Sequence, residues 1–185
     1  MNITKLKIPD VLLLTPKIFS DHRGRFMETF RNKDLTEVTG TRLNFIQGNV
    51  SYSMPWTIRG LHYQDPHPQG KLIRVIHGKI QDVAVDLRAG SATYGKYVSH
   101  ILDDMKCEAL WVPPGFAHGF MTFDNGASVY YECSGGYYAD EWAHDLRWDD
   151  SDIGVVWALP PGRNPLISNK DRAAPPLSSV TPITL

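Results

Sequence analysis

The chain has few cysteines, no excess of basic residues and no long apolar run. Its two cysteines, Cys107 and Cys133, cannot make a disulfide framework, and we interpret both as buried thiols in a reducing compartment. A net charge of −1 gives no general electrostatic attraction to nucleic acid. No apolar segment approaches the roughly 20 residues that span a bilayer, and the first ten residues lack the apolar core of a secretion signal. We therefore expect a cytoplasmic protein that binds neither nucleic acid nor membrane.

Long stretches with helical periodicity are also missing. The 15 glycines and 13 prolines are scattered and divide the sequence into short segments. This pattern predicts many strands joined by tight turns, in an all-β sandwich or barrel. One short helix is predicted over residues 31–40, ending at Gly40. We see no repeat and no domain boundary, so residues 1–185 are expected to form one domain, with a poorly ordered, proline-rich tail after Gly162.

The most informative stretch runs from Asn49 to His62 and ends in the sequence Arg-Gly-Leu-His. Imidazole is the common side chain that accepts a proton near neutral pH, and guanidinium is suited to phosphate oxygens. Two residues three apart on a flat strand face opposite ways. A bulge at Gly60 would turn Arg59 and His62 to one side. The alternative is a surface arginine beside a histidine on an edge strand.

Several other segments place polar groups on strand faces. Phe26, Glu28 and Phe30 share one face of a predicted strand. This suggests either a face that contacts a ligand or an edge strand with its polar residue in water. Residues 71–87 read as two strands with a turn at 77–79, and Lys71 lies on one face of the first. Asp82 and Asp86 share a face of the second, where we expect them to be structural partners of polar interior groups. A Pro-Pro-Gly corner places His118 at the start of a further strand.

These residues argue against three common chemistries. A metal site generally needs three or four ligands. Gln64 stands where a second histidine would follow His62, so only His62 and His118 remain as ligands, which is too few. Cys133 has no basic neighbour in the sequence to activate it as a nucleophile. Neither a nucleophile elbow nor a glycine-rich phosphate loop is present. An imidazole, phenols and cations suit abstraction of a proton next to a carbonyl group, with no metal and no cofactor.

A series of motifs in one order makes the chain resemble the dTDP-4-dehydrorhamnose 3,5-epimerase family, over about Ile8 to Asp171. The motifs are Asp21–Glu28, Gln47–Asn49 with Ser51 and Ser53, Arg59–Gln64, Gln69–Lys71, Asp82–Arg88 and Pro114–Phe120. The resemblance implies a cupin-type jelly roll with short peripheral helices. It also implies a homodimer that exchanges N-terminal strands, and epimerisation of a nucleotide-linked 4-keto-6-deoxyhexose at carbon 3, carbon 5 or both, within deoxysugar biosynthesis.

The resemblance also assigns roles to individual residues. His62 matches the general base, Asp171 the carboxylate that orients it, and Tyr131 the general acid. Lys71 matches the cation that steadies the enolate. The remaining matches are substrate contacts: the pyrophosphate clamp Arg23, Arg59 and His118, the nucleoside contacts Glu28, Gln47 and Asn49, and the further ligand contacts Phe26, Glu141 and Lys170.

The chain departs from the family pattern at the expected rim of the site. Gly48 replaces an acidic residue, Pro55-Trp56 replaces a glycine-containing turn, and one extra residue precedes Tyr137. Ala143 stands where the family often has an acid, with Glu141 close by. The reaction class is therefore better defined than the nucleobase. Two alternatives stay open: a ketoisomerase of the same fold and a non-catalytic sugar-nucleotide-binding barrel. A metal-dependent oxygenase of the same fold would need ligands beyond His62 and His118.

Overall fold

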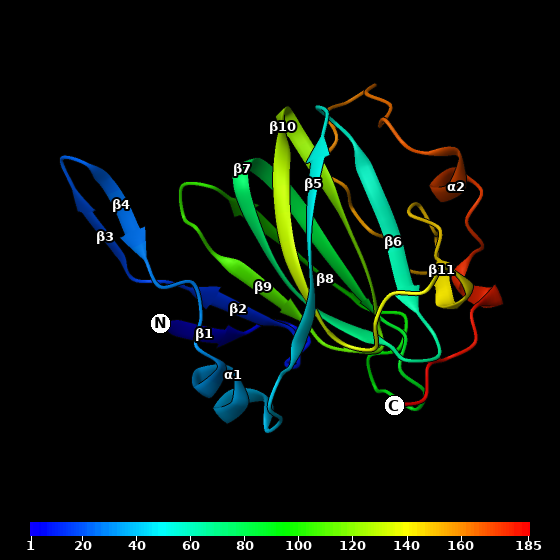
Figure 1. The fold of residues 1–185 in the computed structure, drawn as a ribbon. Coiled ribbons are helices and arrows are strands. Elements are labelled where there is room, and N and C mark those ends of the chain that lie inside the picture. Colours follow the sequence, from blue (N-terminus) through cyan, green and yellow to red (C-terminus); the bar gives the residue numbers. More distant parts are fainter.

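The computed structural model describes all 185 residues, and nearly all of its regular structure is strand (Figure 1). Helices are confined to two short α-helices and two 3-10 turns, and none of them has the length or the apolar character needed to cross a lipid bilayer. The all-β prediction is therefore confirmed. The elements are β1 (Asn2–Lys5), β2 (Leu12–Thr15), β3 (Ile18–Asp21), β4 (Gly24–Met27), α1 (Asn32–Thr39), β5 (Phe45–Ser53), β6 (Ile58–Gln64), β7 (Gln69–Asp86), β8 (Tyr97–Asp103), β9 (Ala109–Val112), β10 (Phe116–Gly135), η1 (Asp140–Trp142), β11 (Ala143–Asp145), α2 (Asn169–Arg172) and η2 (Leu177–Ser179).

Two long strands, β7 and β10, run through both layers of a sandwich. The first half of β7 pairs with β9 and the second half with β8, while β10 pairs along nearly all of β7. The end of β10 also pairs with β5, and its start pairs with β6. The sequence suggested a turn at 77–79, and this prediction is wrong. Gly78, at φ 87°, instead bends one continuous strand, and β10 accommodates the bend with a register shift between Thr122 and Ala127.

Three apolar clusters hold these layers together. The largest lies between the two halves of the sandwich, and it includes Ile73, Val129 and Phe120. The second covers the outer face of β7 around Val83 and Val85, and the third packs Leu35 of α1 against Trp111 of β9. Burial of such side chains is the main favourable term in folding, at about 25 cal/mol per Å² of apolar surface.

The proline-rich tail after Gly162 is ordered, contrary to the sequence prediction. Leu166 forms a parallel bridge with Thr57, and Ile183 forms another with Arg88. Val180 and Ile183 are buried in the second cluster. Because these apolar side chains cover an otherwise exposed sheet face, the tail contributes to the core, and α2 is held beside β6.

Strands β3 and β4 form a separate two-stranded hairpin that extends away from the sandwich (Figure 1). The hairpin pairs Ile18 with Met27 and Asp21 with Gly24, and residues 22–23 form its turn. Its aromatic residues are unusually open, with 52% of Phe19 and 71% of Phe26 exposed. An isolated hairpin with an apolar surface is only marginally stable in water.

Candidate active site

A bulge in β6 builds the first wall of the candidate site. His62 lies opposite His118 of β10, and Arg59 lies opposite Phe120, so two β6 residues face a single residue of β10. The extra residue falls at Gly60, whose φ of 117° favours glycine. A Cβ there would lie 2.7 Å from the backbone of Gly119, so no larger residue fits without movement. The predicted bulge at Gly60 is confirmed, and Arg59 and His62 line one common cavity.

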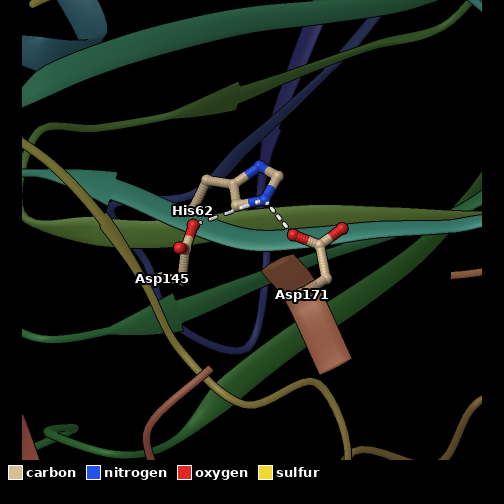
Figure 2. Close-up of side chains that lie close together, drawn as sticks. All are labelled: His62, Asp145 and Asp171. Atoms are coloured by element: carbon tan, nitrogen blue, oxygen red, sulfur yellow. Dashed lines mark hydrogen bonds and ion pairs between the residues drawn. The ribbon is translucent and has the colours of Figure 1, made fainter. Parts of the chain in front are cut away.

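His62 is held by a carboxylate from the distant segment that follows residue 162. Its Nε2 lies 2.7 Å from Oδ1 of Asp171, which follows the N-cap Ser168 of α2 (Figure 2). The backbone N–H groups of Gly60 and Asp171 complete the arrangement by donating to Asp171 Oδ2 and to Ser168 Oγ. Burial alone would raise the pKa of Asp171, but the bond from His62 and the other donors outweigh it and lower that pKa. An ionised carboxylate only accepts, so Nε2 carries the hydrogen and Nδ1 keeps the basic lone pair.

A cavity of about 350 Å³ opens in front of His62. Tyr131 and Cys133 of β10 line it, with Asn49 and Gln47 as their register partners on β5. Lys71 of β7 pairs with Cys133 in the adjoining ladder. The lining residues are Gln47, Asn49, His62, Tyr63, Gln64, Gln69, Lys71, Tyr131, Cys133, Tyr138, Ala143, His144, Asp145 and Lys170. This volume lies within the range of small-molecule sites.

The environment favours one protonation state for each polar group of this cavity. Burial raises the pKa of the Tyr131 hydroxyl, which therefore remains a proton donor at neutral pH. Burial lowers the pKa of Lys71, because desolvation disfavours the ammonium, while the charges of Cys133 and Asp82 act in the opposite direction. Burial also raises the pKa of the Cys133 thiol, so this group is a poor nucleophile. The cavity thus combines the imidazole of His62, the hydroxyl of Tyr131 and the amino groups of Lys71 and Lys170.

Most of the residues singled out in the sequence meet here. Gln47, Asn49, Lys71, Tyr131 and Lys170 line the cavity with His62. Asp171, Arg59 and Lys170 line an adjoining space of about 390 Å³ that shares His62. Arg59 is positioned by donating from Nε to Ser53 Oγ and from Nη2 to the carbonyl oxygen of Tyr52.

His118 is placed differently from the expected pyrophosphate contact. Only 8% of its side chain is exposed, and its Nε2 lies 2.9 Å from both oxygens of the fully buried Asp82. Asp82 and Asp86 were predicted to be partners of polar interior groups, and both are: Asp86 accepts two bonds from the Arg88 side chain. His118 therefore offers only Nδ1 to a ligand.

Four predicted substrate contacts do not reach the cavity of their own chain. Arg23 lies on the β3–β4 hairpin, where its guanidinium pairs with Asp21 at 2.6 Å and is 79% exposed. Phe26 lies on the same hairpin, and Glu28, just after it, pairs with Arg31. Glu141 is exposed in η1.

Sequence reasoning missed one acidic residue of the site. Asp145 of β11 is the register partner of His62, and its side chain lines the cavity with only 16% exposed. Ala143 lies on the same face of β11, two residues earlier. Strand alternation in the sequence could have identified it. Residues 143 and 145 lie on the same face of a strand, so Asp145 supplies a carboxylate on the side where the family often has an acid at position 143.

Comparison with known proteins gives a consistent result. The family model described as dTDP-4-dehydrorhamnose 3,5-epimerase matches residues 5–179. The dTDP-4-dehydrorhamnose 3,5-epimerase of Shigella flexneri is 43% identical over 172 residues, which are 92% of this chain and 93% of that protein.

Solved structures agree in fold. The epimerase of Legionella pneumophila in complex with dTDP-4-keto-L-rhamnose has a TM-score of 0.91 at 38% identity, covering 97% of this chain and 94% of that one. A 3'-monoepimerase of Streptomyces bikiniensis in complex with dTDP-quinovose has a TM-score of 0.85 at 34% identity, covering 94% and 87%. The cupin-type all-β fold implied by the sequence is confirmed.

Proposed function

The chain belongs to the dTDP-4-dehydrorhamnose 3,5-epimerase family, and we propose that its cavity epimerises a dTDP-linked 4-keto-6-deoxysugar through His62 and Tyr131. The protein is an isomerase that acts on carbohydrates, as its relatives are. One observation supports the assignment of residues above all: His62, bonded to Asp171 at 2.7 Å, opens on the same cavity as Tyr131 and Lys71.

The first step is removal of a carbon-bound proton beside the ketone. The 4-keto group acidifies the protons at carbons 3 and 5, and Nδ1 of His62 accepts one of them. The proton gives His62 a positive charge, which Asp171 stabilises across the bond at Nε2. The electron pair left on carbon moves to the ketone oxygen, where the Lys71 ammonium stabilises the enolate.

The second step returns a proton to the opposite face of the same carbon. Tyr131 lies on β10, and His62 lies on β6, so the two groups approach the cavity from different strands. The Tyr131 hydroxyl donates its proton to carbon, the ketone re-forms, and the centre is inverted. Solvent then returns a proton to Tyr131 and removes one from His62.

Recognition of the nucleotide is proposed to use both this chain and a second copy. Arg59 and Lys170 are the cations on the near side, with Gln47 and Asn49 toward the nucleoside. We propose a homodimer in which the β3–β4 hairpin enters the neighbouring site and carries Arg23, Phe26 and Glu28 there. The exposed phenylalanines of the hairpin support this exchange, because a partner would cover them.

We further propose that residues 1–185 act as a single cytoplasmic epimerase domain that needs no metal or cofactor. Relatives in the comparison include a 3,5-epimerase and a 3'-monoepimerase. Either outcome, inversion at both carbons or at carbon 3 alone, is compatible with one base and one acid.

The test is hydrogen exchange in deuterated water. The 4-keto-6-deoxyglucose linked to dTDP, and to CDP, UDP and GDP as controls for the base, is incubated with the protein and analysed by NMR. Wild-type protein should place deuterium at carbon 3, carbon 5 or both, and the dTDP compound should react fastest. His62→Ala should abolish exchange while dTDP still binds. Binding without any exchange by the wild type would favour a non-catalytic barrel, and a 3-keto product would favour the ketoisomerase.

A further inference from the structure

A second carboxylate lies beside the proposed base. Oδ1 of Asp145 is 3.7 Å from Nε2 of His62 and 3.1 Å from Nζ of Lys170 (Figure 2 shows Asp145 and His62). The position is fixed by the sheet, because Asp145 and His62 are register partners in the pairing of β11 with β6. Asp145 is largely buried, whereas 60% of the Lys170 side chain is exposed.

Lys170 is an unfavourable neighbour for a base. It adjoins Asp171 in α2 and shares both cavities with His62. When His62 takes a proton from carbon it becomes a cation. The Lys170 ammonium lies 3.1 Å from the Asp145 oxygen that is itself 3.7 Å from His62, and without a counter-charge it would oppose that change. A unit charge at this range, in a partly desolvated site, changes a protonation equilibrium by about tenfold or more.

The charges of the cluster balance only when Asp145 is present. Before the reaction, Asp145 and Asp171 are negative, Lys170 is positive and His62 is neutral. After proton abstraction the cluster of four is neutral as a whole. If Asp145 were uncharged, the same step would leave a net positive charge in the cavity wall.

We propose that Asp145 is a positioning residue that neutralises Lys170 and so lets His62 accept a proton beside an ammonium group. This inference rests on the proposed function, and it assigns Asp145 no contact with the substrate. Burial disfavours the Lys170 ammonium, but the charge of Asp145 outweighs that cost and raises the pKa of Lys170. Lys170 therefore stays positively charged and can bind an anionic substrate. At the same time the negative charge of Asp145 offsets its repulsion of protonated His62.

Other charged groups do not take over this task. Asp171 is engaged with His62, Ser168 and Gly60. Asp82 is fully buried and bonded to His118. The titratable or charged groups around His62 come from every neighbouring element. They are Arg59 and Tyr63 on its own strand, His144 and Asp145 from β11, Lys170 and Asp171 from α2, the His118–Asp82 pair from β10 and β7, and Lys71, Tyr131, Cys133 and Tyr138 in the cavity lining.

The decisive experiment compares Asp145→Asn with the double variant Asp145→Asn/Lys170→Gln. With dTDP-4-keto-6-deoxyglucose in deuterated water, Asp145→Asn should lower the exchange rate at saturation about tenfold, with KM nearly unchanged. Removing the Lys170 charge as well should restore most of that rate, although KM should rise because a substrate contact is lost. Recovery would not follow if Asp145 merely held the fold. The matched control is Glu37→Gln, which removes the partner of Lys33 on the exposed α1 and should change nothing.

Two results would overturn the inference: an Asp145→Asn rate equal to the wild type, or a loss that persists in the double variant. If Asp145→Asn does not fold, Lys170→Gln alone decides, because this exposed side chain is dispensable for folding. In the substrate-free protein its His62 ring should protonate more readily, because the negative charge of Asp145 is then no longer offset, and an unchanged titration would contradict the proposal.

A measurement without substrate separates this inference from the proposed function. NMR of the His62 ring in the substrate-free protein follows its protonation with pH. Asp145→Asn should make protonation about tenfold less favourable, and the double variant should return it toward the wild type. An unchanged titration would reject the role of Asp145. Wild-type protein that exchanges no label would reject the proposed function, and the titration would still decide the role of Asp145.

Discussion

His62 and His118 lie directly opposite one another in the pairing of β6 with β10, yet their rings bond to different carboxylates. His62 bonds to Asp171, and His118 bonds to Asp82, through Nε2 in both cases. The two pairs differ in access to solvent: 41% of the His62 side chain is exposed, against 8% for His118. One strand pairing thus yields a reactive histidine in the cavity and a structural one behind it.

Loss of the Asp171 carboxylate should slow the exchange reaction strongly. Asp171→Asn keeps the shape but removes the charge that stabilises protonated His62 and fixes its tautomer. We expect the exchange rate to fall about hundredfold, within the usual range for losing a general base, with little change in KM. His77→Ala is a suitable control, because that histidine is exposed and remote from the cavity. An Asp171→Asn enzyme with normal turnover would contradict the assignment.

Replacing the proposed acid should separate the two halves of the reaction. Tyr131→Phe leaves His62 and its carboxylate intact, so proton abstraction continues, but the proton for the opposite face is missing. Deuterium should still enter the substrate with its configuration retained, while the inverted product forms about hundredfold more slowly. NMR of one sample measures both the incorporation of deuterium and the amount of inverted product. Tyr130→Phe, on the other face of β10, is the matched control, and equal loss of exchange and inversion in Tyr131→Phe would argue against an acid role.

Removal of metals should not affect the reaction. Each histidine of the β6–β10 pair already has its Nε2 facing a carboxylate, which leaves the pair poorly arranged to hold an ion between them. Prolonged dialysis against EDTA should therefore leave the exchange rate unchanged, and added Zn²⁺ or Fe²⁺ should not raise it. Loss of activity that a specific metal restores would revive the metal-dependent alternative.

Much of the site was predictable because its residues lie on strands with strong local signals. The alternation in Lys71–Val75 put Lys71 on one strand face, the family resemblance supplied Tyr131, and the glycine in Arg59–His62 marked the bulge. Asp171 is different. It lies more than a hundred residues from His62, in a segment whose prolines suggested disorder, and only the family resemblance identified it.

The departures from the family pattern have physical explanations that require coordinates. Gly48 faces outward from β5, opposite to Gln47 and Asn49, and a Cβ there would lie 3.0 Å from the Tyr130 hydroxyl. The glycine that replaces the family's acidic residue at position 48 therefore leaves the cavity wall intact. Trp56 packs against Phe123 at the turn between β5 and β6, outside both cavities. Side-chain alternation gives the direction of a residue, but which neighbour fills the space follows from tertiary packing.

A buried network away from the site should dominate acid stability. Desolvation would raise the pKa of Asp86, but bonds from Arg88, Ser91 and Thr93 lower it from 3.8 to about 2. A carboxylate whose pKa is lower in the folded state than in the unfolded state stabilises the fold at pH values above its unfolded pKa. This contribution is lost as the pH falls through the folded-state pKa. Asp86→Asn should therefore cost about 2 kcal/mol near neutral pH. The difference from wild type should close between about pH 4 and pH 2 in urea titrations, and a constant difference would contradict this account.

Mixing two inactive proteins tests whether the β3–β4 hairpin works in a neighbouring subunit. Arg23→Ala should be inactive because the hairpin lacks its guanidinium, and His62→Ala because the site lacks its base. If hairpins are exchanged, a mixed dimer carries both defects in one site and none in the other. Random re-association makes half of the dimers mixed, so roughly a quarter of wild-type activity should return.

If Arg23 instead acts in its own subunit, every site of a mixed dimer has one defect, and mixing restores nothing. Lys17→Ala, also near the hairpin, replaces Arg23→Ala in a control that should remain active before mixing. The subunits are unfolded together in urea and refolded, and light scattering confirms the dimer. The distinction is sharp because Arg23 is exposed and its side chain is bonded only to Asp21 of its own chain, which leaves the guanidinium outside the His62 cavity of that chain.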